Sequence, residues 1–226
     1  MYNHKIDGIE ILPEKTANAS IIWLHGLGAS GDDFIPITKE LNLPNHLNIR
    51  FIFPHAPIKP ITINNGARMR AWYDIKDFKE LAIDQEDSHE GLIDSKIIID
   101  NLINREISLG INAEKIVLAG FSQGGALALH AGLRFKFKLA GIICLSGYLP
   151  WHHLLMQEKV KINTSTPIFM GHGEFDQIIP MNFSRNSYNF LHQLGYNISW
   201  HSYLMQHTVI IQEIIDIDNF CKKILA

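Results

Sequence analysis

Short apolar runs recur along the whole chain, and segments with a helical period separate several of them. Several runs are continuous rather than alternating, which is typical of strands covered on both faces. The runs span residues 8–12, 19–26, 48–56, 115–122, 139–147, 166–173 and 198–205. Helical patterns occupy residues 87–110, 124–135, 182–195 and 207–226. This alternation predicts an α/β fold in which helices flank both faces of a mostly parallel central sheet.

One segment breaks the rhythm of strands and helices. Residues 54–84 are rich in proline, asparagine, glycine and arginine, and they include Trp72 and Tyr73. A loop of this length is usually a lid or a binding loop, or else it is disordered. We therefore expect one domain over residues 1–226, with a lid-like surface excursion at about 54–84.

The composition suits a chain with a large core and no strong electrostatic partner. Hydrophobic residues make up 46% and charged residues 19%, and the formal net charge of −3 favours no binding to nucleic acid. The N-terminal residues show no basic stretch followed by an apolar one, and no run approaches the roughly 20 apolar residues of a membrane span. We expect a cytoplasmic protein without a transmembrane segment, either a monomer or a homodimer.

The cysteines and most of the histidines carry no metal-binding or disulfide pattern. Cys144 and Cys221 are the two cysteines of the sequence, and both lie in apolar patterns typical of buried, reduced thiols. His152 and His153 are adjacent in a predicted loop, but no further ligands follow at a metal-binding spacing. The sequence therefore predicts no metal site.

A serine lies between two glycines at residues 120–124, Gly-Phe-Ser-Gln-Gly. The GxSxG pattern is weak by itself, but here an apolar strand precedes it and a helical pattern follows it. That is the setting of a nucleophile elbow, in which a tight turn presents the serine hydroxyl at a helix N-terminus. The alternative is a serine that only caps the helix. We favour Ser122 as a nucleophile.

A nucleophilic serine needs a base and an acid that orients the base. In folds with this elbow the chain order is serine, acid, histidine. Asp176, just after a predicted strand, is the better acid, and Glu174 is its alternative. His207 lies between the last predicted strand and the last helix, whereas His201 lies within that strand, so His207 is the preferred base.

Acyl transfer also needs N–H groups that stabilise the developing oxyanion. The first candidate is the backbone N–H of Gln123, the residue after the nucleophile. The second is the N–H of Leu27, in the glycine-containing segment 25–28 that follows an early strand. Together these parts occur in the order expected of a serine hydrolase.

With these residues in place, the chain resembles the acyl-protein thioesterase/carboxylesterase family of α/β-hydrolases. The most specific segments are GFSQGGA and RMRAWYDI, with LHGLGASGDDF and HGEFDQIIP in support, and the similarity extends from about residue 8 to the C-terminus. The resemblance implies the α/β-hydrolase fold, a triad of Ser122, Asp176 and His207, and an oxyanion hole formed by Leu27 and Gln123. It also implies no metal or organic cofactor.

One residue departs from the pattern of that family. Glycine commonly precedes the catalytic histidine, and Gln206 occupies this position here. If the position required a positive φ, glutamine would be strained there.

The residues that bind the acyl group are less closely defined by the sequence. Loops in similar proteins border an apolar groove, and by position Ile63, Met69, Trp72 and Leu149 are the candidates here. They would suit a short to medium aliphatic chain, although each could instead fill the core beneath its loop. The expected substrate is a small acyl ester or thioester, an acylated protein, or, as the alternative function, a lysophospholipid in aggregates. The apolar loop could also rest transiently on a membrane surface, which the acidic balance does not favour.

Overall fold

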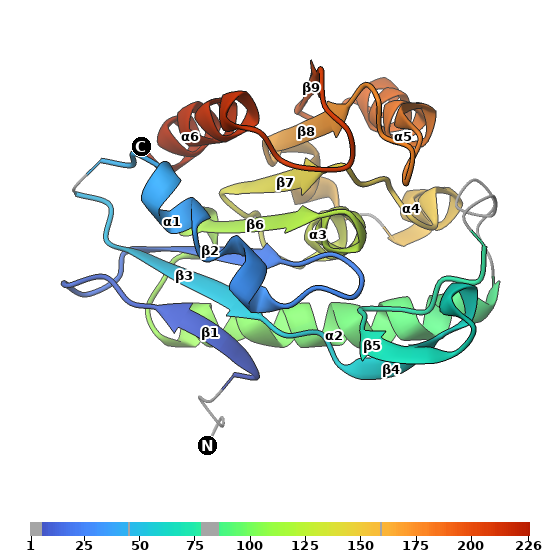
Figure 1. Ribbon diagram of the computed structural model, residues 1–226. Helices are drawn as coiled ribbons and strands as arrows, with labels where there is room; N and C mark the ends of the chain where they lie inside the picture. Colours follow the sequence, from blue (N-terminus) through green and yellow to red (C-terminus); the bar gives the residue numbers. More distant parts are fainter. Residues whose placement is uncertain (1–5, 45, 78–85, 159) are drawn as a thin grey trace.

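The computed structural model describes residues 6–44, 46–77, 86–158 and 160–226, with the backbone alone over 86–90. A seven-stranded sheet runs through the molecule in the order β1-β3-β2-β6-β7-β8-β9 (Figure 1). The strands are β1 (Gly8–Ile11), β2 (Ala19–Leu24), β3 (Ile49–Pro54), β6 (Ile116–Phe121), β7 (Gly141–Leu145), β8 (Ile168–Gly173) and β9 (Ile198–Tyr203). Every pairing is parallel except that of β1 with β3. The predicted mostly parallel sheet and its seven strands are therefore confirmed.

Six helices surround this sheet in the described part of the chain. They are α1 (Ile37–Glu40), α2 (Glu86–Ser108), α3 (Gln123–Arg134), α4 (His152–Glu158), α5 (Met181–Gln193) and α6 (Ile211–Leu225). The four helical patterns of the sequence correspond to α2, α3, α5 and α6. The prediction of a loop at His152 and His153 is wrong, because these residues begin α4. The seven residues of α4 are too few to produce a clear helical period.

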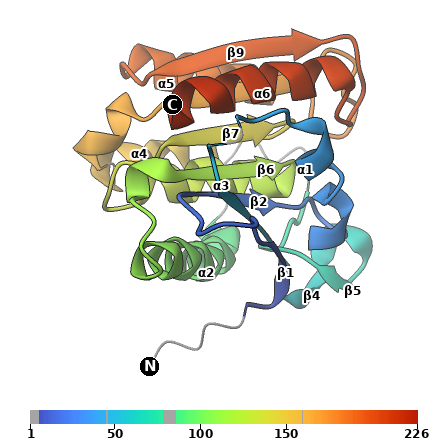
Figure 2. The ribbon, with the colours of Figure 1, turned by 90° about the vertical axis from the view of Figure 1, so that its left-hand side faces the viewer.

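Both faces of the sheet are buried, which explains the continuous apolar runs. In β2, Ile22 and Leu24 belong to the core shared with α2, α3 and α5. Their neighbours Ile21 and Trp23 belong to a second core, on the side of α1 and α6. Side chains of a strand point alternately to its two faces, so both sets must be apolar when both faces are covered. Figure 2, turned by 90°, shows α2 and α6 at well-separated positions around the sheet.

Helix α3 is buried on all sides at the centre of the molecule. Small residues allow this position. A methyl group placed on Gly132 would lie 2.6 Å from Cδ1 of Ile142 in β7. Such an apolar, enclosed helix holds its N-terminus rigidly, and that N-terminus carries the GxSxG serine.

The excursion at residues 54–84 is more ordered than a plain loop over its described part. It forms a two-stranded hairpin of β4 (Ile58–Ile61) and β5 (Ala67–Arg70), which Figure 1 shows beside the carboxyl ends of the parallel strands. Pro60 obscures the strand pattern of this segment in the sequence. Proline is tolerated in β4 because β4 pairs with β5 alone. The chain then turns inward, and Ala71, Trp72 and Tyr73 are buried. Residues 78–84 of the predicted excursion lie outside the described part.

Candidate active site

Ser122 lies in a sharp turn between β6 and α3. Its backbone has φ of 56° and ψ of −120°, a conformation that residues with a Cβ rarely adopt. The Ser122 N–H donates to the carbonyl oxygen of Leu145 at 2.8 Å, and its own carbonyl accepts from the Ala126 N–H at 3.0 Å. Hydrogen bonds to β7 and to α3 therefore hold the strained residue and fix the direction of its side chain.

Glycines on either side of the turn allow its close packing. A methyl group on Gly120 would lie 2.3 Å from the carbonyl oxygen of Gly124. A methyl group on Gly124 would in turn lie 2.3 Å from the carbonyl oxygen of Leu24 at the end of β2. Both obstacles are backbone atoms, so neither can move aside cheaply.

We expect Gly124→Ala to destabilise the protein by about 2–3 kcal/mol, as overpacking of a close-packed core does. The free energy of unfolding from urea titrations measures the effect. Gly66→Ala is the informative comparison, because Gly66 has a φ of +76° but no atom within 4 Å of the added methyl group. If Gly124→Ala cost no more than Gly66→Ala, close approach at the elbow would not be the reason for its glycine.

Three side chains from distant parts of the chain form one chain of hydrogen bonds at this turn. Nε2 of His207 is 2.9 Å from Oγ of Ser122, and Nδ1 of His207 is 2.7 Å from Oδ2 of Asp176. The carboxylate accepts from Nδ1–H, which leaves Nε2 as the acceptor for the serine hydroxyl. His207 lies in the loop between β9 and α6, and Asp176 lies in the loop after β8. The structure thus brings together the three residues that the sequence selected.

Asp176 is held as a carboxylate. Burial by itself raises its pKa, but the hydrogen bonds from His207 and from the backbone N–H of Ile179 lower the pKa below its usual value. Oδ1 accepts N–H groups from Ile178 and Ile179, both at 2.9 Å. The two backbone donors orient the carboxylate so that Oδ2 faces the imidazole.

The other acidic and basic candidates of the sequence lie away from this contact. Glu174 is exposed, and its Oε1 accepts the Ser202 hydroxyl at 3.1 Å. His201 lies on β9, and its ring stacks on that of Phe169 with ring centroids 4.2 Å apart. His172, in contrast, is fully buried beside the triad acid, with Nε2 2.8 Å from the Ile179 carbonyl and 3.4 Å from Oδ2 of Asp176.

The two predicted oxyanion donors belong to residues that line the same cavity as Ser122. Neither the Leu27 N–H nor the Gln123 N–H is bonded to another described residue. Gly26 brings the first of these loops against the nucleophile, because a methyl group on Gly26 would lie 3.4 Å from Cβ of Ser122. The His25 side chain holds this loop through two hydrogen bonds. Its Nδ1 is 2.7 Å from the Gly26 carbonyl, and its Nε2 accepts the Ala56 N–H at 3.0 Å. Burial lowers the pKa of His25, which favours the neutral ring that these two bonds require.

The sequence analysis assigned Gln123 only a backbone role, and the structure gives its side chain a second one. Oε1 accepts the Trp72 N–H at 2.9 Å, and Nε2 donates to the Tyr73 carbonyl at 2.7 Å. Trp72 also donates its Nε1–H to the His25 carbonyl at 2.9 Å. Gln123 and Trp72 therefore tie the end of the hairpin segment to the elbow and to the loop that carries Leu27.

A cavity of about 360 Å³ opens at Ser122 and His207. Its wall is mostly apolar and consists, besides these two residues, of Gly26, Leu27, Ala29, Asp33, Phe34, Tyr73, Ile75, Phe121, Gln123, Tyr148, Ile178 and Ile179. Both predicted oxyanion residues are among them. The cavity offers room for an aliphatic group beside the serine hydroxyl.

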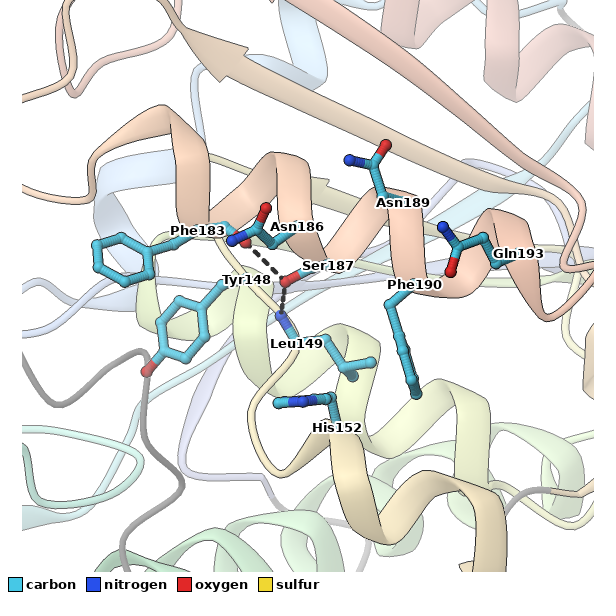
Figure 3. Close-up of a pocket in the computed structure, with 9 residues that line it drawn as sticks. All are labelled: Tyr148, Leu149, His152, Phe183, Asn186, Ser187, Asn189, Phe190 and Gln193. Carbon is cyan, nitrogen blue, oxygen red and sulfur yellow. Dashed lines mark hydrogen bonds between the residues drawn. The ribbon is translucent and has the colours of Figure 1, made fainter.

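The four predicted substrate-binding residues do not lie on the wall of this cavity. Trp72 is fully buried beneath the site, so it supports the cavity rather than lining it. Met69 is half-buried on β5, and its Sδ would be 3.5 Å from a methyl group on Gly28. Ile63 is half-buried, and its N–H donates to the Ile75 carbonyl at 2.9 Å. Leu149 lines a separate cavity against α5 (Figure 3).

Gln206 fits its position without the expected strain. It is exposed and is not among the described residues with positive φ. Close packing occurs instead at Gly173, where a methyl group would lie 2.4 Å from the Gln206 carbonyl oxygen. The substitution therefore leaves the backbone before His207 in an ordinary conformation.

The described residues offer neither a cluster of metal-binding side chains nor a membrane-spanning helix. No group of three or more His, Cys, Asp or Glu side chains in the described ranges is arranged to hold a metal ion. No helix in the described part of the chain is long and apolar enough to cross a membrane. Cys144 and Cys221 are buried and free, as the sequence predicts.

Comparison with known proteins places the chain among ester and thioester hydrolases. A family model described as Phospholipase/Carboxylesterase matches residues 9–225. Acyl-protein thioesterase 1 of Yarrowia lipolytica is 37% identical over 217 residues, which cover 94% of this chain and 95% of that protein. Acyl-protein thioesterase 1 of Saccharomyces cerevisiae is 35% identical over 219 residues, with 93% of this chain and 94% of that protein covered.

Solved structures agree with these relationships. The crystal structure of Arabidopsis thaliana SOBER1 is 32% identical, with a TM-score of 0.85 over 93% of this chain and 100% of that chain. Zea mays acyl-protein thioesterase 2 is 26% identical, with a TM-score of 0.85 over 98% of this chain and 100% of that chain. The predicted α/β-hydrolase fold is confirmed. The chain belongs to the phospholipase/carboxylesterase family, and it is a serine hydrolase of the esterase or thioesterase type.

Proposed function

We propose that this protein hydrolyses acyl thioesters and esters through a Ser122–His207–Asp176 triad and an acyl-enzyme intermediate. The observation that carries the proposal is the unbroken hydrogen-bond chain from Asp176 through His207 to Ser122, at 2.7 and 2.9 Å, beside an apolar cavity. The names of the related acyl-protein thioesterases support thioesters as the preferred substrate class.

In the first step, Oγ of Ser122 attacks the carbonyl carbon while Nε2 of His207 takes the hydroxyl proton. The N–H groups of Leu27 and Gln123 stabilise the negative charge on the former carbonyl oxygen. Asp176 keeps the Nδ1–H tautomer and stabilises the imidazolium. His207 then gives its proton to the leaving thiolate or alkoxide as the carbon–sulfur or carbon–oxygen bond breaks. In the second step His207 activates water, which releases the acid and restores the serine.

The acyl chain is proposed to occupy the cavity at Ser122. Isoleucine and aromatic side chains from five separate segments form its wall, among them Ile75, Phe34, Tyr148 and Ile179. Removing a hydrocarbon chain from water stabilises the bound state by about 0.8 kcal/mol for each buried methylene. Catalytic efficiency should therefore rise with chain length until the cavity is full, and then stop rising.

Two measurements test the proposal together. The first is kcat/KM for p-nitrophenyl esters and for matched acyl thioesters with two to twelve acyl carbons. The second is the stoichiometry of labelling by a fluorophosphonate, with peptide mapping of the modified residue. We expect one label per chain on Ser122, and an efficiency maximum at one chain length. Labelling of another residue, or no labelling by a reactive fluorophosphonate, would refute the mechanism.

A further inference from the structure

A second cavity, of about 330 Å³, lies along α5 (Figure 3). One wall is helix α5, and the other is the segment from Tyr148 to His152 at the start of α4. At its base the Leu149 N–H donates to Oγ of Ser187, which itself donates to the Phe183 carbonyl, both at 2.9 Å. These bonds join the two walls. We call this cavity the α5 groove.

The α5 groove presents apolar rings and carboxamides on one wall. Phe183, Asn186, Phe190 and Gln193 follow one another at intervals of three and four residues, so they share one face of the helix. Asn186 and Gln193 are exposed, and no hydrogen bond ties either amide to another described residue. Across the groove, the ring of His152 meets Phe190 edge to face, with centroids 5.3 Å apart. The lining of the groove thus combines packed rings with exposed amide groups.

The α5 groove adjoins the cavity at Ser122. Tyr148 lines both, and its hydroxyl is 3.1 Å from the Tyr73 hydroxyl on the wall of the catalytic cavity. Ile178 and Ile179 line the catalytic cavity and precede α5 by only a few residues. The two cavities therefore share a wall at Tyr148, next to the site where the carbonyl group of a substrate would lie.

We propose that the α5 groove binds the peptide segment that flanks the acylated residue of a protein substrate. This inference rests on the proposed function, since it assigns the two parts of an acylated protein to two neighbouring cavities. The acyl chain occupies the cavity at Ser122, and the polypeptide occupies the α5 groove. The protein would then select its substrates by their sequence near the acylated residue as well as by their acyl chain.

The side chains that line the two cavities indicate which part of the substrate each would bind. The catalytic cavity is mostly apolar, as a hydrocarbon chain requires. The α5 groove alternates rings with carboxamides, and each carboxamide offers both a donor and an acceptor, like the peptide group that it would meet. None of the residues that line the groove is Lys, Arg, Asp or Glu, so it lacks a charged partner for a phospholipid head group. A neutral peptide with apolar side chains fits this surface.

The length of the α5 groove also suits a short peptide. Phe183 and Gln193 are ten positions apart on α5, which corresponds to about 15 Å along a helix. An extended chain covers that distance with about four to five residues. The peptide would be held by its backbone at Asn186 and Gln193 and by its side chains against the rings.

Two synthetic substrates, one with a peptide and one without, test the inference without the natural protein substrate. The first is a neutral eight-residue peptide with one S-octanoyl cysteine, and the second is p-nitrophenyl octanoate, which has no peptide. The variant is the double replacement Asn186→Ala with Gln193→Ala. Asn182→Ala is the matched control, because Asn182 is an exposed amide on the same helix that does not line the groove.

We expect the double variant to lower the ratio of kcat/KM for the peptide to kcat/KM for the ester about 10-fold, with Asn182→Ala leaving the ratio at its wild-type value. An unchanged ratio in the double variant would overturn the inference. A shift in the preferred length of the p-nitrophenyl ester would also overturn it, because the groove would then hold the acyl chain. If wild type hydrolysed neither substrate, the proposed function itself would fail, which is a separate result from an unchanged ratio.

Discussion

Replacing Ser122 with alanine is expected to lower kcat for p-nitrophenyl octanoate by about 10⁵- to 10⁶-fold. The reason is that the hydroxyl supplies the atom that bonds to the acyl carbon, and no described neighbour takes its place at the elbow. His207 would keep its hydrogen bond to Asp176 but would lack a nucleophile to deprotonate. Steady-state hydrolysis at several enzyme concentrations measures the loss.

Two controls separate the loss of the nucleophile from the loss of the fold. Ser165→Ala removes a serine whose hydroxyl donates to the Ile162 carbonyl in an exposed turn, and it should retain the wild-type rate. Thermal unfolding of Ser122→Ala should show no loss of stability, since alanine removes one oxygen atom from a side chain that is already in place. A variant that kept more than a small fraction of the wild-type kcat would show that another group attacks the substrate.

The sequence predicted the central sheet because burial on two faces leaves a plain signal. Strands such as residues 116–121 have no room for polar side chains on either face, so they appear as unbroken apolar runs. The hairpin of β4 and β5 left a mixed signal, with Pro60 inside one strand and solvent on its exposed side. Asn65 and Gly66, with φ of 54° and 76°, were the usable clue, because Asn-Gly at a reversal is typical of a hairpin.

The triad residues could be selected from sequence because chain order restricts them. Ser122 stands in a specific motif, and only a few acids and histidines follow it at strand ends. Chain order and motifs do not tell in which direction a side chain points. Trp72 looked like a substrate contact because it is large and lies in a loop-like segment, yet its ring turns inward to donate to the His25 carbonyl. The role of the Gln123 amide was missed for the same reason, since its partners at residues 72 and 73 are 50 positions or more away.

Glu213 is a buried acid to which the proposed mechanism assigns no role. It lies in the first turn of α6, fully buried, and a methyl group on Gly171 of β8 would lie 2.2 Å from its Oε1. Neither carboxyl oxygen is hydrogen-bonded to a described residue. Burial, and then the charge of Asp216, raise the pKa of Glu213 to about 8. The carboxyl group therefore holds its proton at neutral pH.

This raised pKa couples folding to pH with a definite sign. In the unfolded chain the carboxyl has its ordinary pKa of 4.5, while in the folded chain the value is about 8. The contribution of the proton to stability is complete below pH 4.5 and is lost as the pH rises to about 8. Across that window the contribution of Glu213 to the free energy of unfolding falls by about 1.4 kcal/mol for each pH unit. Above it both states are ionised, and this group causes no further change.

We therefore expect Glu213→Gln to be more stable than wild type at pH 8 by a few kcal/mol, and to have a similar stability at pH 5. Glutamine keeps the shape of the protonated side chain and cannot ionise. Urea unfolding at pH 5, 6.5 and 8 measures both proteins, and Glu174→Gln, at an exposed carboxylate of the β8–α5 loop, serves as the control that should keep the wild-type pH dependence. Parallel pH profiles of wild type and Glu213→Gln would contradict the prediction, because they would mean that Glu213 is already ionised in the folded protein at pH 5.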